Sequence, residues 1–123
     1  MSRLHFGLSI ERQGEAWILS RPGASRRVLA RNYRCRGGEL DLVLEERRPD
    51  GAWELVFVEI RYRGEGAWIP AAESVDGLKR LRLSRAIRRY LQSYRGEAET
   101  VRVDVLARGP GGWEHLTDIR IDG

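Results

Sequence analysis

The segment from Gly38 to Arg63 constrains the fold more than any other part of the chain. It contains two runs of alternating and apolar residues that flank a Pro49-Asp50-Gly51 triplet. Proline presets φ, aspartate can bond its own backbone, and glycine supplies a positive φ, so the triplet favours a tight turn. The pattern predicts an antiparallel hairpin with strands at about residues 39–46 and 53–62.

A turn centred on Asp50 determines which residues of the hairpin face one another. Facing residues then have numbers that sum to 100, which places Asp41 opposite Glu59 and Glu39 opposite Arg61. Because side chains alternate across a strand, residues two apart share a face. The face predicted to be core carries Leu40, Leu42, Leu44, Val56, Val58 and Ile60. The other face carries the four charged residues at the end away from the turn, with Val43, Leu55 and Phe57 beyond them.

Asp41 and Glu59 are thus two carboxylates placed opposite one another, which destabilises a sheet by a few tenths to about 1 kcal/mol. A cation between them removes the repulsion. A hard divalent cation such as Mg²⁺ takes carboxylate oxygens and keeps water positions open. The alternative is a cross-strand salt-bridge cluster in which Arg61 is the internal counter-ion. Spacing alone leaves both interpretations open.

The composition indicates one ordinary globular domain over residues 1–123, long enough to bury a hydrophobic core. The lone Cys35 and the lack of an apolar secretory segment favour a reducing cytoplasm. Because no apolar run approaches the length of a membrane span, no membrane partner is expected. One cysteine and two isolated histidines argue against a zinc site.

The net charge of +4 and the pI of about 9.8 favour a polyanionic partner. A helix predicted over residues 73–94 concentrates this charge opposite its apolar stripe. Its cations are Lys79, Arg80, Arg82, Arg85, Arg88 and Arg89, followed by Arg95. They are interpreted either as a surface that tracks a phosphate backbone or as a solvated basic face. Lys79 is the only lysine among 22 basic residues.

The remaining segments complete a mixed α/β sheet flanked by helices. The patterns predict a short helix at 9–20 that carries Glu15, a strand at 27–33, a strand at 100–107 and a terminal strand at 113–119. Spacing alone is compatible with Glu15 as an ordinary solvated carboxylate. A loop at 63–70 leaves the hairpin close to Glu59, and its Trp68 either stacks on a base or folds back onto the core.

Several of these segments together resemble the YraN family of small bacterial proteins. The segments are Gly14-Glu15-Ala16-Trp17, Ala30-Arg31-Asn32-Tyr33-Arg34, Gly38-Glu39-Leu40-Asp41-Leu42 and Phe57-Val58-Glu59-Ile60-Arg61-Tyr62-Arg63. Ser74 to Lys79 and Val101 to Val105 fit the later segments of the family. The resemblance covers nearly the whole chain in order, and the pair of hairpin motifs is its specific part.

The resemblance implies a restriction-endonuclease-like fold with a PD-(D/E)xK active site, closest to archaeal Holliday-junction resolvases. That fold has a central mixed sheet with helices on both sides. The implied activity is hydrolysis of phosphodiester bonds in DNA with Mg²⁺ or Mn²⁺, selective for the structure of the substrate. Nucleases of this fold often act as dimers, so a homodimer is among the expectations.

The resemblance also implies roles for individual residues. Asp41 takes the motif's aspartate and Glu59 its second acid, and both are expected to ligate the metal. Arg61 occupies the position of the motif's lysine. Glu15 matches an acid of the N-terminal helix that completes the metal site in the resolvase-like branch. Glu39 belongs to the family motif without an assigned role.

The arginine at position 61 is a departure from the motif. It can clamp a phosphate with two hydrogen bonds, but its pKa is too high for proton transfer. Lys79 is therefore a candidate to supply the missing ammonium, provided that its helix packs beside the hairpin. The short N-terminal helix, ended by Arg21-Pro22-Gly23, is a second departure, because it can shift Glu15 away from the metal.

Three hypotheses follow from the sequence. The first is a nuclease with Asp41, Glu59, Arg61 and Lys79 as its catalytic residues. Its expected nucleic-acid contacts are Arg63, Lys79, Arg82, Arg85 and Arg89. The second is a nucleic-acid-binding module of the same fold that has lost cleavage. The third is a protein-interaction scaffold whose acidic cluster is neutralised internally by Arg61 and Arg63.

Overall fold

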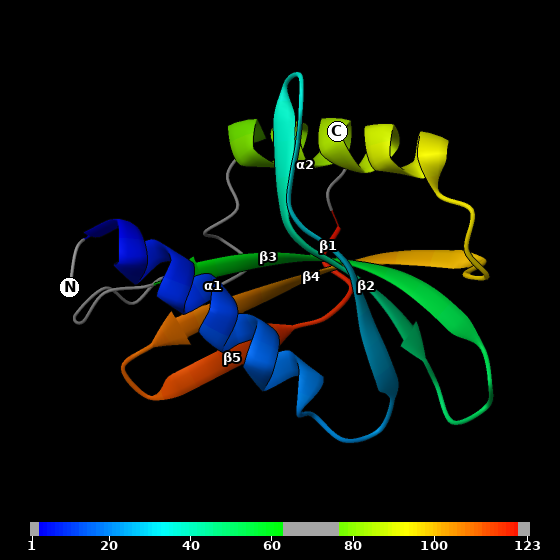
Figure 1. The fold of residues 1–123 in the computed structure, drawn as a ribbon, viewed down its shortest axis with the longest axis horizontal. Helices are drawn as coiled ribbons and strands as arrows, with labels where there is room; N and C mark the ends of the chain where they lie inside the picture. Colours follow the sequence, from blue (N-terminus) through cyan, green and yellow to red (C-terminus); the bar gives the residue numbers. More distant parts are fainter. Residues whose placement is uncertain (1–2, 63–76, 121–123) are drawn as a thin grey trace.

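The computed structural model describes residues 3–62 and 77–120, and within them five strands form one mixed sheet between two helices (Figure 1). The elements are α1 (Arg3–Leu19), β1 (Ser25–Cys35), β2 (Gly38–Arg47), β3 (Trp53–Tyr62), α2 (Gly77–Ser93), β4 (Thr100–Gly109) and β5 (Gly112–Leu116). Their order across the sheet is β1-β2-β3-β4-β5. Only β3 and β4 run parallel, and α2 connects them, as a parallel crossover requires. The predicted mixed sheet with flanking helices is confirmed.

The β2–β3 hairpin has the predicted register. Leu42 pairs with Val58 and Leu44 with Val56, so the residue numbers of each pair sum to 100. The turn closes with a hydrogen bond of 2.8 Å from the Gly51 N–H to the Arg48 carbonyl, and Gly51 has a φ of 90°. The Asp50 carboxylate accepts the Ala52 N–H at 2.9 Å, which is the local role expected of aspartate in a turn.

Both faces of the sheet are core, whereas the sequence analysis expected one face to be core and the other to carry charge. Val43, Leu55 and Phe57 pack beneath α2, and Leu42, Val56 and Val58 form a second cluster with Ile10 and Ile18 of α1. These two layers account for the nearly continuous burial of the middle of β3. Alternation of side chains along a strand indicates one buried face, whereas here a helix covers each face of the sheet.

Leu40 lies on the opposite face of the sheet from the one predicted. It packs on the α2 side with Val43, whereas Leu42 and Leu44 pack on the α1 side. The alternation therefore breaks at Asp41, and the pairing of β2 with β3 ends at Leu42. Beyond this point β2 remains paired only with β1, where Glu39 lies opposite Arg34 and not opposite Arg61 as predicted.

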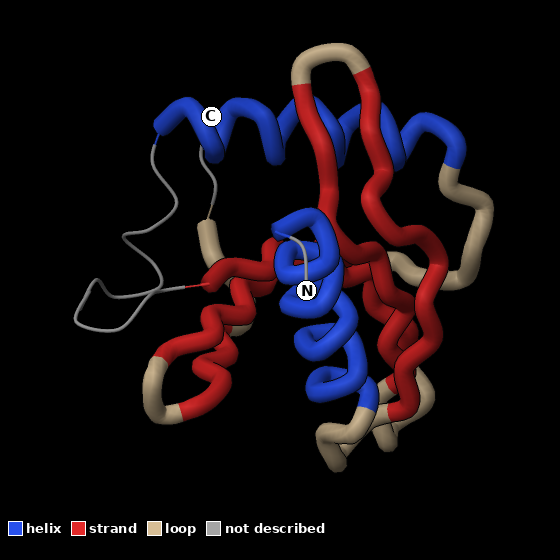
Figure 2. The backbone as a smooth tube through the Cα atoms, turned by 60° about the vertical axis from the view of Figure 1, so that its left-hand side comes forward, coloured by secondary structure: helices blue, strands red, loops and turns tan. Residues whose placement is uncertain are grey.

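The free end of the β1–β2 hairpin bends out of the sheet and passes over α2 (Figures 1 and 2). Its turn contains Gly37, whose φ is 89°, followed by Gly38. A Cβ on Gly38 would lie 2.1 Å from the backbone oxygen of Arg82 and 3.2 Å from the Ala86 side chain. The hairpin thus approaches the backbone of α2 as closely as a glycine permits.

The helix α1 begins earlier than predicted and lies close to the sheet. It runs from Arg3 instead of residue 9, and it ends at Leu19 near the predicted position. Gly14 is tolerated within it because a Cβ there would lie 3.1 Å from Ile60 and 3.2 Å from Trp113. Glycine lowers the intrinsic helix propensity at this position, but the absence of a Cβ lets the helix pack closely on β3 and β5.

A buried ion-pair network crosses the sheet on the α1 side, toward the Pro49 turn. The Arg102 guanidinium contacts Glu46 at 3.0 Å, Glu54 at 2.8 Å and Asp104 at 2.9 Å. Although burial opposes ionisation, hydrogen bonds from His115, Arg102 and the Asp118 N–H, with the Arg102 charge, hold the pKa of Asp104 below its usual value. The Asp104 carboxylate accepts a hydrogen bond from the His115 Nε2 at 2.8 Å. The network joins β2, β3, β4 and β5 and serves a structural role, since removing one partner of such a pair leaves a buried charge uncompensated.

We expect Gly38→Ala to destabilise the protein, because the new Cβ overlaps the α2 backbone and neither element can move without disturbing the core. The expected loss in the free energy of unfolding is about 2 kcal/mol or more. Urea denaturation followed by tryptophan fluorescence and far-UV circular dichroism measures it.

Gly111→Ala is the matched control, since Gly111 has open space around its Cα and lies in the β4–β5 turn. It should change stability by less than about 0.5 kcal/mol. Equal stabilities for the two variants would contradict the close approach at Gly38.

Candidate functional site

Asp41 lies at the point where β2 separates from β3, and its carboxylate replaces the missing ladder contact. Its Oδ2 accepts the Ile60 N–H at 2.8 Å. The Asp41 side chain is also hydrogen-bonded to the Glu59 side chain. The two acids predicted to face one another are therefore together in the structure, joined by a hydrogen bond that requires one of them to hold a proton.

Glu59 is the more deeply placed of the two carboxyls, with a side-chain exposure of 3%. The Lys79 ammonium on the first turn of α2 lies 2.8 Å from its Oε1. Arg61 lies two residues along β3, with its Nε 3.8 Å from the same oxygen. The helix does pack beside the hairpin, so the only lysine of the chain lies at the carboxyl pair.

Burial raises the pKa of both carboxyls, and the Asp41 charge adds to the shift at Glu59. Burial is the largest cause at Glu59 and the Asp41 charge the second, and together they raise the pKa of Glu59 to about 7, although Lys79 opposes the shift. Burial also raises the pKa of Asp41, against the Ile60 N–H and the Glu59 hydrogen bond. The pair therefore holds one proton at mildly acidic pH and releases it near neutrality.

Glu15 does not contact this pair in the structure. The Arg31 guanidinium holds both of its carboxylate oxygens, at 2.6 and 2.8 Å. Glu11, one turn earlier on α1, interacts electrostatically with the site: burial and then the Asp41 charge raise the pKa of Glu11. A small cavity of about 110 Å³ is lined by Glu11, Glu15 and Asp41 together with Arg31.

Glu11 is a residue that the sequence analysis missed. The available signal was its i, i+4 spacing with Glu15, which places both acids on one side of α1. The role of Glu15 as a metal ligand stays a prediction. The structure presents Glu11 as the second acid of α1 that faces the same cavity.

Arg61 lies partly exposed at the edge of the pair. Its side chain is 25% exposed, and its Nε is shielded from solvent without a hydrogen-bond partner among the residues described. Glu39 is more exposed, lies 3.5 Å from the Arg34 Nε, and adds negative charge that raises the pKa of Asp41. The carboxyl pair is thus bordered by one cation and one further acid.

Only some of the residues predicted to contact nucleic acid lie together in the structure. Arg82, Arg85 and Arg89 are exposed on α2. Arg85 and Arg89 line a hollow of about 600 Å³ with the tip of the β1–β2 hairpin, and Arg82 lines a neighbouring hollow of about 370 Å³. Arg63 and Trp68 lie outside the described residues, as does the predicted start of the helix at 73–76.

Within residues 3–62 and 77–120, no group of three or more His, Cys, Asp or Glu side chains is arranged to hold a metal ion. The pair of Asp41 and Glu59 nevertheless fits a hard divalent cation in its chemistry, since both donors are carboxylate oxygens. The proton that the pair holds at mildly acidic pH is the charge that a bound cation would replace. Two residues that could hold such an ion are therefore present, and Glu11 lines a cavity with one of them, Asp41.

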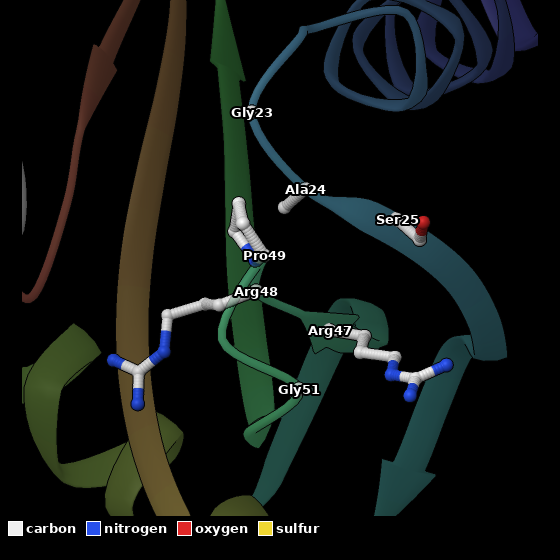
Figure 3. A pocket seen from close by; sticks show the side chains of 7 residues that line it. All are labelled: Gly23, Ala24, Ser25, Arg47, Arg48, Pro49 and Gly51. Carbon is white, nitrogen blue, oxygen red and sulfur yellow. The ribbon is translucent and has the colours of Figure 1, made fainter.

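Another hollow, of about 430 Å³, lies at the far end of the β2–β3 hairpin (Figure 3). Gly23, Ala24, Ser25, Pro49 and Gly51 form much of its wall. Figure 3 shows Arg47 and Arg48 on its rim extending in opposite directions. Because the two guanidinium groups do not converge, this hollow lacks the arrangement of an anion site.

The family model of the uncharacterised protein family UPF0102 matches residues 13–107. The chain belongs to this family. UPF0102 is the YraN family, so the resemblance identified from the hairpin motifs is confirmed. The matched range includes α1 from Gln13, the whole hairpin, α2 and most of β4.

Several bacterial UPF0102 proteins are similar to this chain. One from Cupriavidus pinatubonensis is 44% identical over 88 residues, 72% of this chain and 65% of that protein. One from Stutzerimonas stutzeri is 45% identical over 96 residues, 76% of each chain. One from Methylococcus capsulatus is 43% identical over 100 residues, 80% of this chain and 76% of that protein.

The alignments leave part of some relatives uncovered: the chain spans 65% of the Cupriavidus protein and 66% of one from Pseudomonas entomophila. The names of these UPF0102 proteins assign no activity. In the part of the chain that the structure describes, neither helix has the length and apolar character needed to cross a bilayer.

The raised pKa of Glu59 predicts that the metal-free protein loses stability as pH rises. A glutamate ordinarily has a pKa of 4.5, so between that value and about 7 the native state binds more protons than the unfolded state. The free energy of unfolding then falls with pH, by at most about 1.4 kcal/mol per pH unit. Glu59→Gln removes the titrating group and should flatten this dependence.

Urea denaturation in EDTA at pH 5, 6, 7 and 8 tests this expectation. Glu97→Gln is the control, because Glu97 is an exposed carboxylate in the α2–β4 loop. It should retain the dependence of the unmodified protein. A slope that survives Glu59→Gln unchanged would show that Glu59 does not hold the proton.

Proposed function

We propose that this protein is a divalent-metal-dependent nuclease with a restriction-endonuclease-like fold. The observation that carries the proposal is the buried Asp41–Glu59 carboxyl pair with the Lys79 ammonium 2.8 Å from Glu59. A sheet with a purely structural role does not require two buried acids in contact with one another. Their position at a strand fork, beside a basic helix, supports a site that acts on phosphates.

Asp41 and Glu59 would hold Mg²⁺ or Mn²⁺, with Glu11 or Glu15 as a further acid of α1. When bound, such an ion lowers the pKa of a coordinated water and offsets charge on the phosphate. The Ile60 N–H fixes the orientation of the Asp41 carboxylate through its Oδ2. Because the carboxylate is held in one orientation, its other oxygen is already positioned before a ligand binds.

Lys79 and Arg61 would together supply the positive charge that a single lysine supplies in the PD-(D/E)xK motif. Arg61 presents a planar guanidinium suited to two oxygens of a phosphate, and it stays charged throughout. Lys79 carries a compact ammonium with three N–H donors, which would offset negative charge on the phosphate. Both contact the Glu59 carboxylate in the structure, at 3.8 and 2.8 Å respectively.

The decisive experiment is cleavage of branched, duplex and single-stranded DNA in titrations of Mg²⁺ and Mn²⁺. Asp41→Asn and Glu59→Gln should each reduce the cleavage rate by a factor of about 100 or more, because each removes one of two metal-ligating charges. Lys79→Met should reduce the rate with a smaller effect on metal affinity. Arg61→Lys should retain activity, since it restores the lysine of the PD-(D/E)xK motif.

Arg48→Ser is the control, because Arg48 lies in the β2–β3 turn at the far end of the hairpin. Cleavage that persists in both carboxyl variants would identify a contaminating nuclease and contradict the proposal. Isothermal titration with Mn²⁺ supplies a second readout, and binding should release protons at pH 6 if the shared proton is displaced.

The second candidate is a nucleic-acid-binding module of the same fold without cleavage. The observation in its favour is that Lys79 already neutralises Glu59, so that the carboxyl pair is satisfied without a metal. This function predicts salt-dependent DNA binding, no turnover with any divalent cation, and no loss of binding in Asp41→Asn.

A further inference from the structure

The hollow between α2 and the tip of the β1–β2 hairpin is strongly basic. Its volume is about 600 Å³, and five arginines line it with no aspartate or glutamate among the lining residues described. The arginines are Arg34, Arg36, Arg85, Arg88 and Arg89, and the other lining residues are Tyr33, Cys35 and Gln92. Arg34, Arg36 and Arg88 were not among the residues predicted to bind nucleic acid.

These arginines come from two separate elements that the fold holds against each other. Arg34 and Arg36 belong to the hairpin tip, and Arg85 and Arg89 belong to α2. The approach of Gly37 and Gly38 to the helix brings them together: a Cβ on Gly37 would lie 3.1 Å from the Arg85 side chain. Like charges gathered in this way repel one another, so a bound polyanion would relieve a cost that a solvated helix face alone would not carry.

An aromatic side chain forms part of the wall of the same hollow. Tyr33 packs edge-on against Tyr90, with ring centroids 5.3 Å apart, and Tyr90 packs in the same way on Phe57 at 5.7 Å. This stack fixes the position of the Tyr33 ring beside the arginines. A basic groove with a rigid aromatic ring is the combination that binds single-stranded nucleic acid, because bases stack on the ring while phosphates contact the cations.

The hairpin also restricts what can approach α2. A helix about 10–12 Å wide fills the major groove of a DNA duplex, which is about 12 Å wide. The hairpin tip crosses α2 and contacts its backbone at Arg82, so a duplex cannot enclose the helix there (Figure 2). The hollow beside the crossing remains open to a single strand.

The hollow also leads toward the carboxyl pair. A second hollow, of about 370 Å³, shares Arg34 and Cys35 with the first and extends to Gly38, Glu39 and Arg82. Glu39 is close enough to Asp41 for its charge to raise the pKa of that carboxyl. A strand held in the first hollow would therefore run toward Asp41.

We propose that this hollow binds the phosphate backbone of a single-stranded segment of nucleic acid, with Arg36, Arg85 and Arg89 on phosphates and Tyr33 against a base. The segment would flank the bond that the carboxyl pair acts on, and this last point alone rests on the proposed nuclease function. Binding in the hollow needs no metal, so it is tested independently of cleavage.

The test is fluorescence anisotropy with labelled oligonucleotides of about 20 nucleotides, single-stranded and blunt duplex, in EDTA. The salt concentration is varied between about 50 and 200 mM. The single strand should bind more tightly than the duplex. Arg36→Ser/Arg89→Ser should weaken its binding about tenfold or more and reduce the slope of log K against log salt by about 1.4, for two lost phosphate contacts.

Arg21→Ser/Arg48→Ser is the matched control, since it removes the same charge from the α1–β1 loop and the β2–β3 turn. It should leave the salt slope unchanged. Tyr33→Leu should weaken binding with no change in slope, because stacking is lost while phosphate contacts remain. Far-UV circular dichroism verifies that each variant is folded.

Three outcomes would overturn the proposal. Equal affinity for single strand and duplex would remove the single-strand assignment. Equal losses in the two double variants would show that net charge, and not the hollow, drives binding. Binding to phosphatidylglycerol vesicles without binding to either oligonucleotide would assign the basic surface to a membrane. Cleavage without a contribution from the hollow, or binding without cleavage, would separate this inference from the proposed function.

Discussion

The hydrogen bond from the Ile60 N–H to the Asp41 carboxylate is the interaction on which the rest of the site depends. In a continuous antiparallel pair, that N–H would contribute to the ladder between β2 and β3. Here a side chain accepts it at the residue where the ladder stops, so the backbone of β2 is released without leaving a buried donor unpaired. The released segment can then follow β1 out of the sheet and over α2.

Burial gives the carboxyl pair its chemical character. Two acids in contact at a solvent-exposed sheet edge would both ionise and repel weakly, because water screens them. At a side-chain exposure of 3% the charged form of Glu59 is penalised, and the pair keeps a proton up to about pH 7. Lys79 limits this effect without cancelling it. The site is consequently poised near neutrality, where a small change in bound cation or proton alters its charge.

The local parts of this architecture could be predicted from the sequence, since they depend on neighbouring residues. The Pro49-Asp50-Gly51 turn determines the register, whose last pair, Leu42 with Val58, lies directly beside Asp41 and Glu59. The break at Asp41 could not be predicted in the same way, because Leu40 and Leu42 have the same alternation as an unbroken strand. What moves Leu40 to the α2 side is the contact of Gly38 with the helix, which is a tertiary interaction.

The same limit explains the acids and arginines that the sequence analysis missed. Glu11 and Glu15 are equivalent on spacing, and the choice between them depends on Arg31 of β1, which binds Glu15. Arg34 and Arg36 carry no local signal of binding, and only the position of the hairpin over α2 places them beside Arg85 and Arg89. Long-range packing selects among residues that local patterns leave equivalent.

One bend of the hairpin therefore produces two features that are far apart in the sequence. At its base, the bend frees Asp41 to join Glu59, and at its tip it brings Arg36 beside Arg89. Because Gly38 anchors the tip on the same helix that supplies Lys79, the carboxyl pair and the basic hollow are held by a common element. Under the proposed nuclease function, the Lys79 ammonium that α2 places at Glu59 would take the role of the motif's lysine, while β3 carries Arg61.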